Sequence, residues 1–387
     1  MFLLDYNLTE DQQMLRDLCR QIAEEKIRPY SRELDEKEEH PTQIMKDLAQ
    51  SDLFSLAIPE AYGGMGTGLM ELCIATEEIS RVDGGVATSY AASFLGMFPI
   101  LLHGTEEQKK KYLPDIASGK HLTAFALTEP EAGSDAAGVK TTARKDGDYY
   151  ILNGTKHFIT NGGDAQIYTI IAVTNKAKGP RGVSAFILEK GTPGFTFGKK
   201  EEKLGIRASS TAELIFNDVK VHKDNLLGNK EGIGFIATMK TFDQSRPGVA
   251  AQAVGIAQGA LELATKYAHE RIQFGKPISS FQGIQWMLAD MATKTEAARS
   301  LVYSVASMVD RGKKNSGPAS AAAKLFASDT AMQVTTDAVQ IYGGYGYMRD
   351  YPVEKFMRDA KITQIYEGTN QIQRSIIALS LIKKYTK

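Results

Sequence analysis

Cysteine is scarce in this chain, with only Cys19 and Cys73 among 387 residues. The two do not form a CxxC pair, and neither lies in a cluster with histidine at the spacing of metal ligands. Neither a disulfide framework nor a structural zinc site is therefore supported by the sequence. We therefore expect a protein that folds in a reducing compartment.

The sequence also lacks an excess of either charge, because 46 Lys and Arg residues balance 46 Asp and Glu residues. Nothing therefore marks the chain as a binder of nucleic acid or of a membrane surface, and neither partner is expected. No uninterrupted apolar run of about 18 residues is present, and no basic segment leads into an apolar core. We expect a soluble, cytoplasmic protein of bacterial type, with a processed mitochondrial matrix form as the alternative.

What the sequence does contain is a change of pattern along its length. Thr9 and Gln12 form a capping-box signature before apolar residues at helical spacing. Similar periodicity over 42–53, 68–82, 86–103 and 105–118 predicts a helical domain over 1–120. Short β-rich runs at 148–152, 168–173, 183–188 and 213–221 predict an all-β barrel or sandwich over 121–229.

Helical periodicity returns in the last third, over 249–270, 280–311, 318–340 and 354–384. Four long helices with short connections predict a four-helix bundle over 230–387. The chain is therefore expected to be an α+β protein with three domains, since its length also exceeds that of a single hydrophobic core.

Two motifs lie in or beside the predicted β domain. In AFALTEPEAGSD (124–135), Thr128 and Ser134 offer hydroxyl donors on a tight turn, which suits a ring carbonyl or a phosphate oxygen. An ordinary Gly/Pro turn is the alternative. In GTKHFITNGG (154–163), Phe158 and Thr160 would share one face of a strand, where they could stack on and hydrogen-bond a flat heterocycle. A core phenylalanine beside a surface threonine explains the same pattern.

Four further motifs lie in the helical last third, and each has a plain structural alternative. FDQSRP (242–247) precedes a predicted helix and places Asp243 and Arg246 one helical turn apart, as a surface ion pair or as a ligand site. RIQFGKP (271–277) puts Arg271 before a turn, where it could neutralise a pyrophosphate or simply be solvated.

The last two motifs lie near the C-terminal end. QIYGGYGY (340–347) is a glycine-rich break between helices, which permits close approach of a ligand or serves as a plain turn. IYEGTNQIQ (365–373) places Glu367 at a helix start, as a base or as a capping residue.

Taken together and in this order, the motifs TEPEAGSD, FITNGG, RIQFGKP, QIYGGYGY and RDAKITQIYEGTNQIQ closely resemble those of the acyl-CoA dehydrogenase family. The resemblance covers essentially the full length. It implies a helical N-terminal domain, a middle β-barrel domain and a C-terminal four-helix bundle, assembled as a homotetramer with one FAD per subunit. It further implies an acyl-CoA substrate, a role in β-oxidation, and electron-transferring flavoprotein as the electron acceptor.

The resemblance also assigns residues to the cofactor and to CoA. On the β-domain side it places residues at the flavin ring, with Ser134 at a phosphate or the pantetheine: Phe125, Leu127, Thr128, Phe158 and Thr160. It assigns a second group to the pyrophosphate and adenosine, largely across a subunit interface: Arg271, Gln273, Phe274, Phe281, Gln340, Gly343, Gly344, Thr369 and Gln371. Asp243 and Arg246 match the start of the CoA-binding helix, and Phe158 stands where many medium-chain members carry tryptophan.

The chemistry that the resemblance implies is proton removal by Glu367 from the α-carbon while the β-hydride passes to flavin N5. Two hydrogen bonds to the thioester carbonyl would stabilise the enolate, from the Glu367 N–H and from the flavin ribityl chain. Some relatives carry the base at the position of Ser245, which cannot serve. The acyl pocket is expected to be lined by Tyr90, Ala91, Leu95 and Tyr366, with room for a butyryl-to-octanoyl, branched or cyclic group, and Gly368 is also assigned to the substrate.

Three rival readings share parts of this pattern. An acyl-CoA oxidase would contain every motif but pass its electrons to oxygen. A nitroalkane oxidase would be expected to carry aspartate in place of Glu367. A non-catalytic, nucleic-acid-binding relative would need a basic patch, against which the balanced charge argues.

Overall fold

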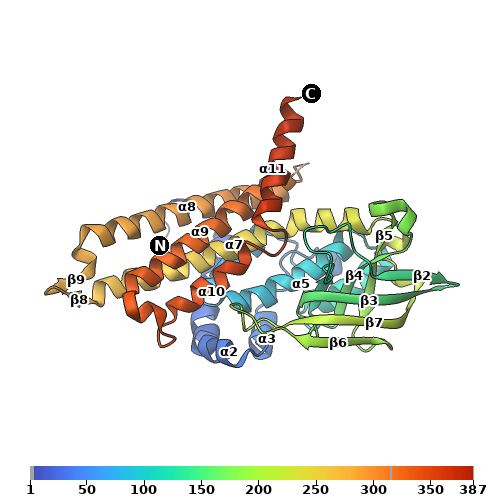
Figure 1. Ribbon diagram of the computed structural model, residues 1–387, viewed down its shortest axis with the longest axis horizontal. Coiled ribbons are helices and arrows are strands. Elements are labelled where there is room, and N and C mark those ends of the chain that lie inside the picture. Colours follow the sequence, from blue (N-terminus) through green and yellow to red (C-terminus); the bar gives the residue numbers. More distant parts are fainter. Residues whose placement is uncertain (1–3, 314–315, 387) are drawn as a thin grey trace.

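The computed structural model describes residues 4–313 and 316–386, and its elements fall into three successive groups (Figure 1). The first group is helical: α1 (Glu10–Ile22), α2 (Ser31–Lys37), α3 (Thr42–Gln50), α4 (Leu69–Ser80), α5 (Gly84–His103) and α6 (Glu106–Ala117). The predicted capping box is present, because Thr9 Oγ1 accepts from the Gln12 N–H at 3.2 Å and Gln12 Oε1 accepts from the Thr9 N–H at 3.1 Å. Local helix signals were therefore sufficient in this part of the chain.

The second group is a curled sheet of seven strands: β1 (Thr123–Ala126), β2 (Thr142–Asp146), β3 (Tyr149–Thr160), β4 (Ile167–Val173), β5 (Val183–Glu189), β6 (Phe195–Lys200) and β7 (Thr211–His222). The order is β1-β4-β2-β3-β7-β6, with β5 on β4. Within the described residues no ladder joins β6 to β1 or β5, so the sheet curls without closing its edges. The sequence analysis had not identified β1, β2 and β6, which are four to six residues long.

The third group contains α7 (Gly234–Glu270), a hairpin of β8 (Ile272–Gln273) and β9 (Lys276–Pro277), α8 (Gln282–Asp310), α9 (Gly317–Tyr342), α10 (Val353–Thr363) and α11 (Asn370–Tyr385). Two predictions were wrong here. The motif FDQSRP lies inside α7 rather than before it, because the helix begins at Gly234 and continues through Pro247. The predicted helix over 354–384 is interrupted between α10 and α11, where Glu367 and Gly368 have φ angles of 51° and 95°.

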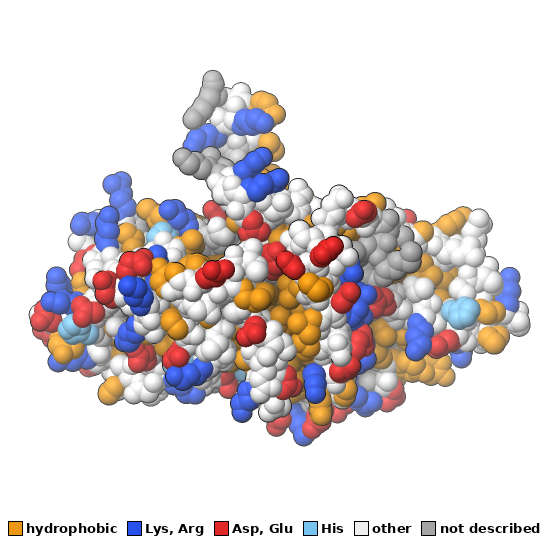
Figure 2. Space-filling view, turned by 180° about the vertical axis from the view of Figure 1, so that it is seen from behind, with side chains coloured by type: hydrophobic (Ala, Val, Ile, Leu, Met, Phe, Trp, Pro, Cys, Tyr) orange, Lys and Arg blue, Asp and Glu red, His pale blue; other side chains and the backbone are white. Residues whose placement is uncertain are grey.

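Helix α5 holds the three groups together, because it packs against β1 on one side and against α4 and α7 on the other. Among the described helices, α5 alone has the length and hydropathy to cross a membrane, yet 78% of its apolar window is buried inside the protein. Its apolar character is thus accounted for by the core. The C-terminal helix α11 projects from the body and carries apolar and basic side chains into solvent (Figure 2).

Candidate active site

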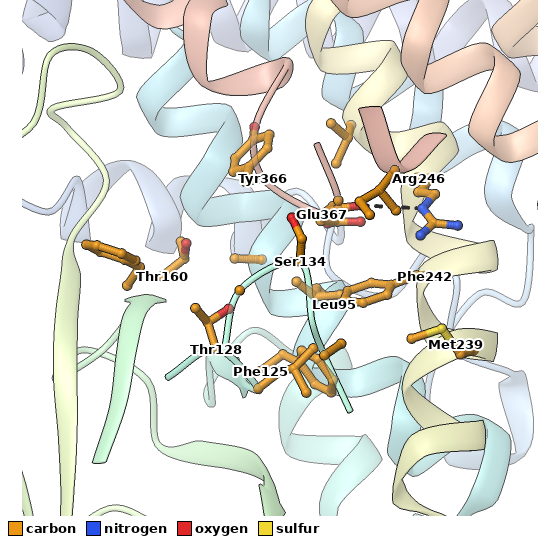
Figure 3. Close-up of a pocket in the computed structure, with 18 of the residues that line it drawn as sticks. Leu95, Phe125, Thr128, Ser134, Thr160, Met239, Phe242, Arg246, Tyr366 and Glu367 are labelled. Carbon is orange, nitrogen blue, oxygen red and sulfur yellow. Dashed lines mark hydrogen bonds between the residues drawn. The ribbon is translucent and has the colours of Figure 1, made fainter. Parts of the chain in front are cut away.

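A largely apolar cavity of about 420 Å³ lies where α5, α7, the sheet and the turn between α10 and α11 meet (Figure 3). Residues of β1, its following loop and β3 form what we call the sheet wall: Phe125, Leu127, Thr128, Ser134, Phe158 and Thr160. The opposite side, called the helical wall, contains Phe242, Arg246, Tyr366, Glu367 and Gly368. Segments more than 100 residues apart in the sequence therefore meet at one space.

Glu367 occupies the helical wall on a strained turn. Its φ of 51° is left-handed, a conformation that non-glycine residues seldom adopt outside constrained sites. The carboxylate accepts a hydrogen bond of 2.5 Å from the Ser245 hydroxyl. Burial raises the pKa of Glu367 above its usual value, against the opposing effects of the Ser245 hydroxyl, Arg246 and Lys324. A carboxyl in this setting is a stronger base than one in water.

The carbonyl groups of this turn are held, whereas its N–H groups are free. The Glu367 carbonyl accepts from Arg246 Nε at 3.4 Å and from Gln373 Nε2 at 3.2 Å. The Gly368 carbonyl accepts from Gln373 Nε2 at 2.8 Å and from Lys324 Nζ at 2.9 Å. Within the described residues, the N–H groups of Glu367, Gly368 and Thr369 have no acceptor. They are therefore available to a bound anion or carbonyl oxygen.

Arg246 is the positively charged residue of the helical wall. It is 4% exposed, and its Nη1 lies 3.6 Å from Asp243 Oδ1. Its guanidinium also lies 5.5 Å from the ring centroid of Phe242. The predicted Asp243–Arg246 pair is therefore real, but it is a partly buried pair beside the cavity rather than a surface ion pair.

The sheet wall rests on a buried ion pair. Lys156 is fully buried, and its Nζ donates to Glu129 Oε1 at 2.7 Å and to the Leu127 carbonyl at 2.9 Å. Glu129 also accepts from the Thr141 N–H at 2.9 Å and from the Lys140 N–H. This network fixes the backbone on both sides of Thr128.

Phe158 and Thr160 both line the cavity, as predicted, although β3 is irregular at this point. The pairing with β7 shifts between Lys156 and Ile159, and Phe158 has a φ of 58°. Its ring remains 60% exposed. The hydroxyls of Thr128, Ser134 and Thr160 make no hydrogen bond to protein atoms of the described residues. An exposed ring beside uncommitted donors can stack on and hydrogen-bond a flat heterocycle.

The floor of the cavity contains two polar residues that the sequence analysis missed. The Tyr366 hydroxyl donates to Gln252 Oε1, and Gln252 Nε2 donates to Thr88 Oγ1 at 2.7 Å and to the Gly84 carbonyl at 2.9 Å. Thr88 lies on the same side of α5 as Ala91 and Leu95, so helical spacing could have identified it. Gln252 has no local sequence signal that could have identified it as a cavity residue.

The prediction for Tyr90 was wrong. Its side chain is fully buried in the N-terminal helical group, where its hydroxyl donates to the Leu53 carbonyl at 2.8 Å. Its ring contacts Phe54 and Phe94 rather than the cavity. Residues one position apart on a helix point about 100° apart, so Ala91 faces the cavity while Tyr90 faces the core. Ala91, Leu95, Tyr366 and Gly368 do line the cavity.

A second space of about 640 Å³ adjoins the first and shares Thr128, Phe158, Thr160 and Glu367 with it. It extends between the sheet and the 361–369 segment and reaches Thr369, whose hydroxyl accepts from the Ile372 N–H to cap α11. Gln371 lines neither space and is exposed on α11. The two adjoining spaces thus share the sheet wall and the Glu367 turn as common boundaries.

The remaining predicted residues lie at the far end of the helical bundle from the sheet (Figure 1). Arg271, Gln273, Gly343 and Gly344 line a separate groove of about 520 Å³. The Arg271 guanidinium lies 5.4 Å from the ring centroid of Tyr345. Phe274, at the tip of the β8–β9 hairpin, is 93% exposed and contacts Phe281, while Gln340 is exposed at the end of α9. Within one chain, this group does not meet the cavity.

No group of three or more His, Cys, Asp or Glu side chains in the described part of the chain is arranged to hold a metal ion. The polar chemistry of the cavity therefore rests on the carboxyls of Asp135 and Glu367, one guanidinium, several hydroxyls and the N–H groups of the 367–369 turn that have no acceptor in the described residues.

Comparison with known proteins gives three successive family matches: the acyl-CoA dehydrogenase N-terminal domain over residues 9–120, the middle domain over 124–219 and the C-terminal domain over 232–382. An acyl-CoA dehydrogenase from Bacillus subtilis (strain 168) is 52% identical over 377 residues, covering 97% of this chain and 99% of the relative.

Solved structures agree with the sequence matches. Butyryl-CoA dehydrogenase from Megasphaera elsdenii is similar with a TM-score of 0.95 at 49% identity, over 98% of this chain and 100% of that chain. A chain from structural work on the electron transferring flavoprotein of Acidaminococcus fermentans gives a TM-score of 0.96 at 54% identity, with 98% and 100% coverage. The chain therefore belongs to the acyl-CoA dehydrogenase family, whose members are FAD-dependent oxidoreductases acting on the CH–CH bond of acyl-CoA thioesters.

Proposed function

We propose that this protein oxidises the α,β carbon–carbon bond of a short acyl-CoA thioester to the 2-enoyl-CoA, with Glu367 as the base. The observation that carries the proposal is the position of Glu367, whose carboxyl lies at the wall of an apolar cavity on a left-handed turn. Backbone strain of this kind persists only where the surrounding structure enforces it, and it is concentrated at functional sites.

The α-proton of a thioester is only weakly acidic, so its removal needs a base that is stronger than a carboxylate in water. Burial supports this role, because it raises the pKa of Glu367. The Ser245 hydroxyl, Arg246 and Lys324 act in the opposite direction and so keep the carboxylate form accessible. Glu367 would take the α-proton and hold it as the carboxylic acid.

The negative charge that develops on the thioester oxygen needs hydrogen-bond donors. The Glu367 N–H is unpaired within the described residues and belongs to the same residue as the base. We infer that this N–H donates to the thioester carbonyl. One residue would then provide both the base and a donor, with the α-carbon held between them.

The cavity fits the FAD on which the family depends. The sheet wall offers an exposed aromatic ring, Phe158, and the uncommitted hydroxyls of Thr128 and Thr160, while Phe125 and Leu127 provide apolar contact. When bound, FAD supplies the acceptor for the β-hydride. The residues of the chain would hold the ring flat against β3 and exclude water from the reacting carbons.

Arg246, Asp243 and Ser134 are proposed to hold the CoA portion. Arg246 brings a buried positive charge to the mouth of the cavity, where it suits an anionic ligand such as the CoA phosphates. Asp243 pairs with Arg246 at 3.6 Å and so fixes its orientation. Ser134 lies on the loop opposite, with its hydroxyl uncommitted (Figure 3).

The floor of the cavity favours a short acyl chain. Thr88, Gln252 and Tyr366 are joined by hydrogen bonds beneath Ala91 and Leu95. A long alkyl chain would have to displace these bonds and bury their polar atoms unpaired, which costs free energy. A butyryl group, the substrate named for the Megasphaera elsdenii structure, would end above this floor.

The distant group around Arg271 is proposed to complete the FAD site of another copy of the chain in a homotetramer. Two observations support an oligomer: Arg271, Gln273, Gly343 and Gly344 lie together yet far from the cavity, and α11 exposes Leu379, Ile382 and Tyr385 to solvent. Electron-transferring flavoprotein is proposed as the electron acceptor, supported by the similar chain from the Acidaminococcus fermentans work.

The proposal is tested by mixing the FAD-loaded protein anaerobically with butyryl-CoA, octanoyl-CoA and cyclohexanecarboxyl-CoA and following the flavin absorbance. We expect rapid bleaching with butyryl-CoA and slower bleaching with the two larger substrates. Slow recovery of the absorbance on admission of air identifies a dehydrogenase, whereas recovery within a turnover time identifies an oxidase. Failure of every acyl-CoA to bleach the flavin would contradict the proposal.

A further inference from the structure

A fully buried lysine, Lys324 of α9, lies behind the turn that carries Glu367. Its Nζ donates to the Gly368 carbonyl and to Asn370 Oδ1, both at 2.9 Å. Neither of these acceptors carries a formal charge. Lys324 itself gave no functional signal in the sequence, because it stands in an ordinary helical pattern of alanines and serines.

Lys324 differs from the other fully or nearly fully buried lysines of the protein. Lys156 pairs with Glu129 at 2.7 Å, and Lys355 pairs with Asp359 at 2.6 Å. Across residues 4–313 and 316–386, no carboxylate lies within 4.0 Å of Lys324 Nζ. A buried lysine without a carboxylate partner opposes folding, because it must either keep a desolvated charge or give up its proton, so its retention at this place needs another explanation.

The turn next to Lys324 supplies that explanation. Glu367 and Gly368 are consecutive left-handed residues, with φ angles of 51° and 95°. For Glu367 this conformation is unfavourable and has to be enforced by its surroundings. Of the two donors to the Gly368 carbonyl in the described structure, Gln373 is neutral and Lys324 is the one that can carry charge. The carbonyl is therefore held from two helices, by Lys324 of α9 at 2.9 Å and by Gln373 of α11 at 2.8 Å.

We propose that Lys324 is a positioning residue for the catalytic base: its hydrogen bond to the Gly368 carbonyl locks the left-handed turn that aims the Glu367 carboxyl at Ser245 and into the cavity. The inference rests on the proposed role of Glu367 but concerns a different residue. Lys324 lies behind the turn and does not line the cavity, so it does not touch the substrate; it holds the backbone of the turn and also lowers the pKa of Glu367.

Asn370 allows the two functions of Lys324 to be separated. Ser328, one turn further along α9, also contacts Asn370, because Asn370 Nδ2 donates to Ser328 Oγ at 2.9 Å. Ser328 makes no contact with the carbonyls of Glu367 and Gly368. Replacing Ser328 by alanine therefore weakens the start of α11 without touching the turn, which makes Ser328→Ala the matched control for Lys324→Met.

The first measurement is amide hydrogen exchange of Tyr366 and Asn370, whose N–H groups donate to the Ile362 and Gln364 carbonyls on either side of the turn, in FAD-loaded protein without substrate. We expect Lys324→Met to exchange at least about tenfold faster than wild type, because the turn opens more often. Ser328→Ala should stay within about twofold. Lys324→Gln, which keeps a neutral donor, should fall between the two and replaces Lys324→Met if that variant does not fold. Unchanged exchange in the methionine or glutamine variant would overturn the proposal.

The second measurement is the rate of flavin reduction at saturating butyryl-CoA. A misplaced base costs up to roughly 100-fold, so Lys324→Met should lower the rate about 10-fold to 100-fold with acyl-CoA affinity unchanged. A loosened turn with an unchanged reduction rate would show that Lys324 does not position the base. Failure of the proposed function has a different signature, namely normal flavin reduction by Glu367→Gln, which leaves the exchange result intact.

Discussion

The sheet wall and the helical wall of the cavity each rest on a buried lysine that donates to a backbone carbonyl, but the two lysines differ in their charge partners. On the sheet side, Lys156 donates to the Leu127 carbonyl and pairs with Glu129 at 2.7 Å. On the helical side, Lys324 donates to the Gly368 carbonyl and finds an amide oxygen, Asn370 Oδ1, in place of a carboxylate.

The difference appears in the proton affinity of the two groups. Burial lowers the pKa of Lys156 to about 8, with Glu129 opposing the decrease. Burial lowers the pKa of Lys324 further, to about 7, with Glu367 opposing the decrease and Arg246 adding to it. A carboxylate directly beside Lys324 would compete with Glu367 for positive charge and for space. The sheet wall thus rests on a paired lysine, while in the described part of the helical wall the Glu367 carboxyl has no lysine partner within 4.0 Å and stays available for chemistry.

Breaking the ion pair of the sheet wall should give the largest change in stability. Glu129→Ala leaves Lys156 buried and unpaired, so we expect the free energy of unfolding to fall by about 3–5 kcal/mol. The double variant Glu129→Ala/Lys156→Met, which removes both charges, should recover most of this loss. Thermal denaturation of both variants provides the measurement. Equal losses in the single and double variants would show that the pair is not a structural unit.

Arg271 belongs to neither wall, and its replacement tests whether the cofactor site extends beyond a single chain. Arg271→Ala should weaken FAD retention by about 1.5–3 kcal/mol, the range for a hydrogen bond to a charged group, with both walls intact. The FAD-to-protein absorbance ratio and size-exclusion chromatography report the effect. Lys276→Ala, in the same exposed hairpin, is the matched control. A fully loaded tetramer in Arg271→Ala would argue against a cofactor role for this arginine.

Neighbouring residues of α5 separate the cavity from the core. Ala91→Phe should fill the space above the polar floor. For octanoyl-CoA and cyclohexanecarboxyl-CoA, relative to butyryl-CoA, we expect the activation free energy for kcat/KM to rise by about 1–3 kcal/mol. Tyr90→Phe removes the bond to the Leu53 carbonyl and should lower stability by about 1 kcal/mol without changing selectivity. Ala91→Phe should therefore change substrate selectivity, whereas Tyr90→Phe should change only stability. An unchanged substrate ratio in a destabilised Ala91→Phe protein would place Ala91 in the core.

The pH dependence of stability tests the charge state of Lys324. Between pH 7 and 10.5, Lys324 is largely neutral in the folded protein but charged in the unfolded chain, because its usual pKa is 10.5. The unfolded state then binds more protons, so the free energy of unfolding rises with pH, by at most about 1.4 kcal/mol per unit. Lys324→Met should remove this contribution to the slope. A slope that is the same in wild type and variant, measured by urea unfolding, would contradict a buried, depressed lysine.

Local sequence patterns predicted the elements whose signals are themselves local. The capping box at Thr9 and Gln12, the periodicity of α3 to α6 and the glycine-rich end of α9 were all found where expected. The start of α7 was misplaced because Pro247 looks like a helix boundary, although its buried position within α7 is tolerated. The fold class followed from these elements together with the resemblance to the family.

The geometry of the site could not be predicted in the same way. A glutamate with a positive φ has no local sequence signal, since the turn at Glu367 is enforced by Arg246, Lys324 and Gln373 from other parts of the chain. The position of Gln252 in the site likewise could not be predicted, because only its hydrogen bonds to Thr88 and Tyr366 distinguish it from any other polar residue in an apolar helix. The motifs therefore indicated which segments meet, while tertiary contacts decided how their side chains lie.

The role of Glu367 is tested most directly by comparing the rate of flavin reduction by butyryl-CoA in Glu367→Gln and in wild type, after rapid anaerobic mixing. The substitution keeps the size of the side chain and removes the base. We expect FAD binding and acyl-CoA binding to persist, and the rate of reduction to fall by at least about three orders of magnitude. Reduction at close to the wild-type rate would contradict the assignment of the base and, with it, the proposed division of labour between the two walls.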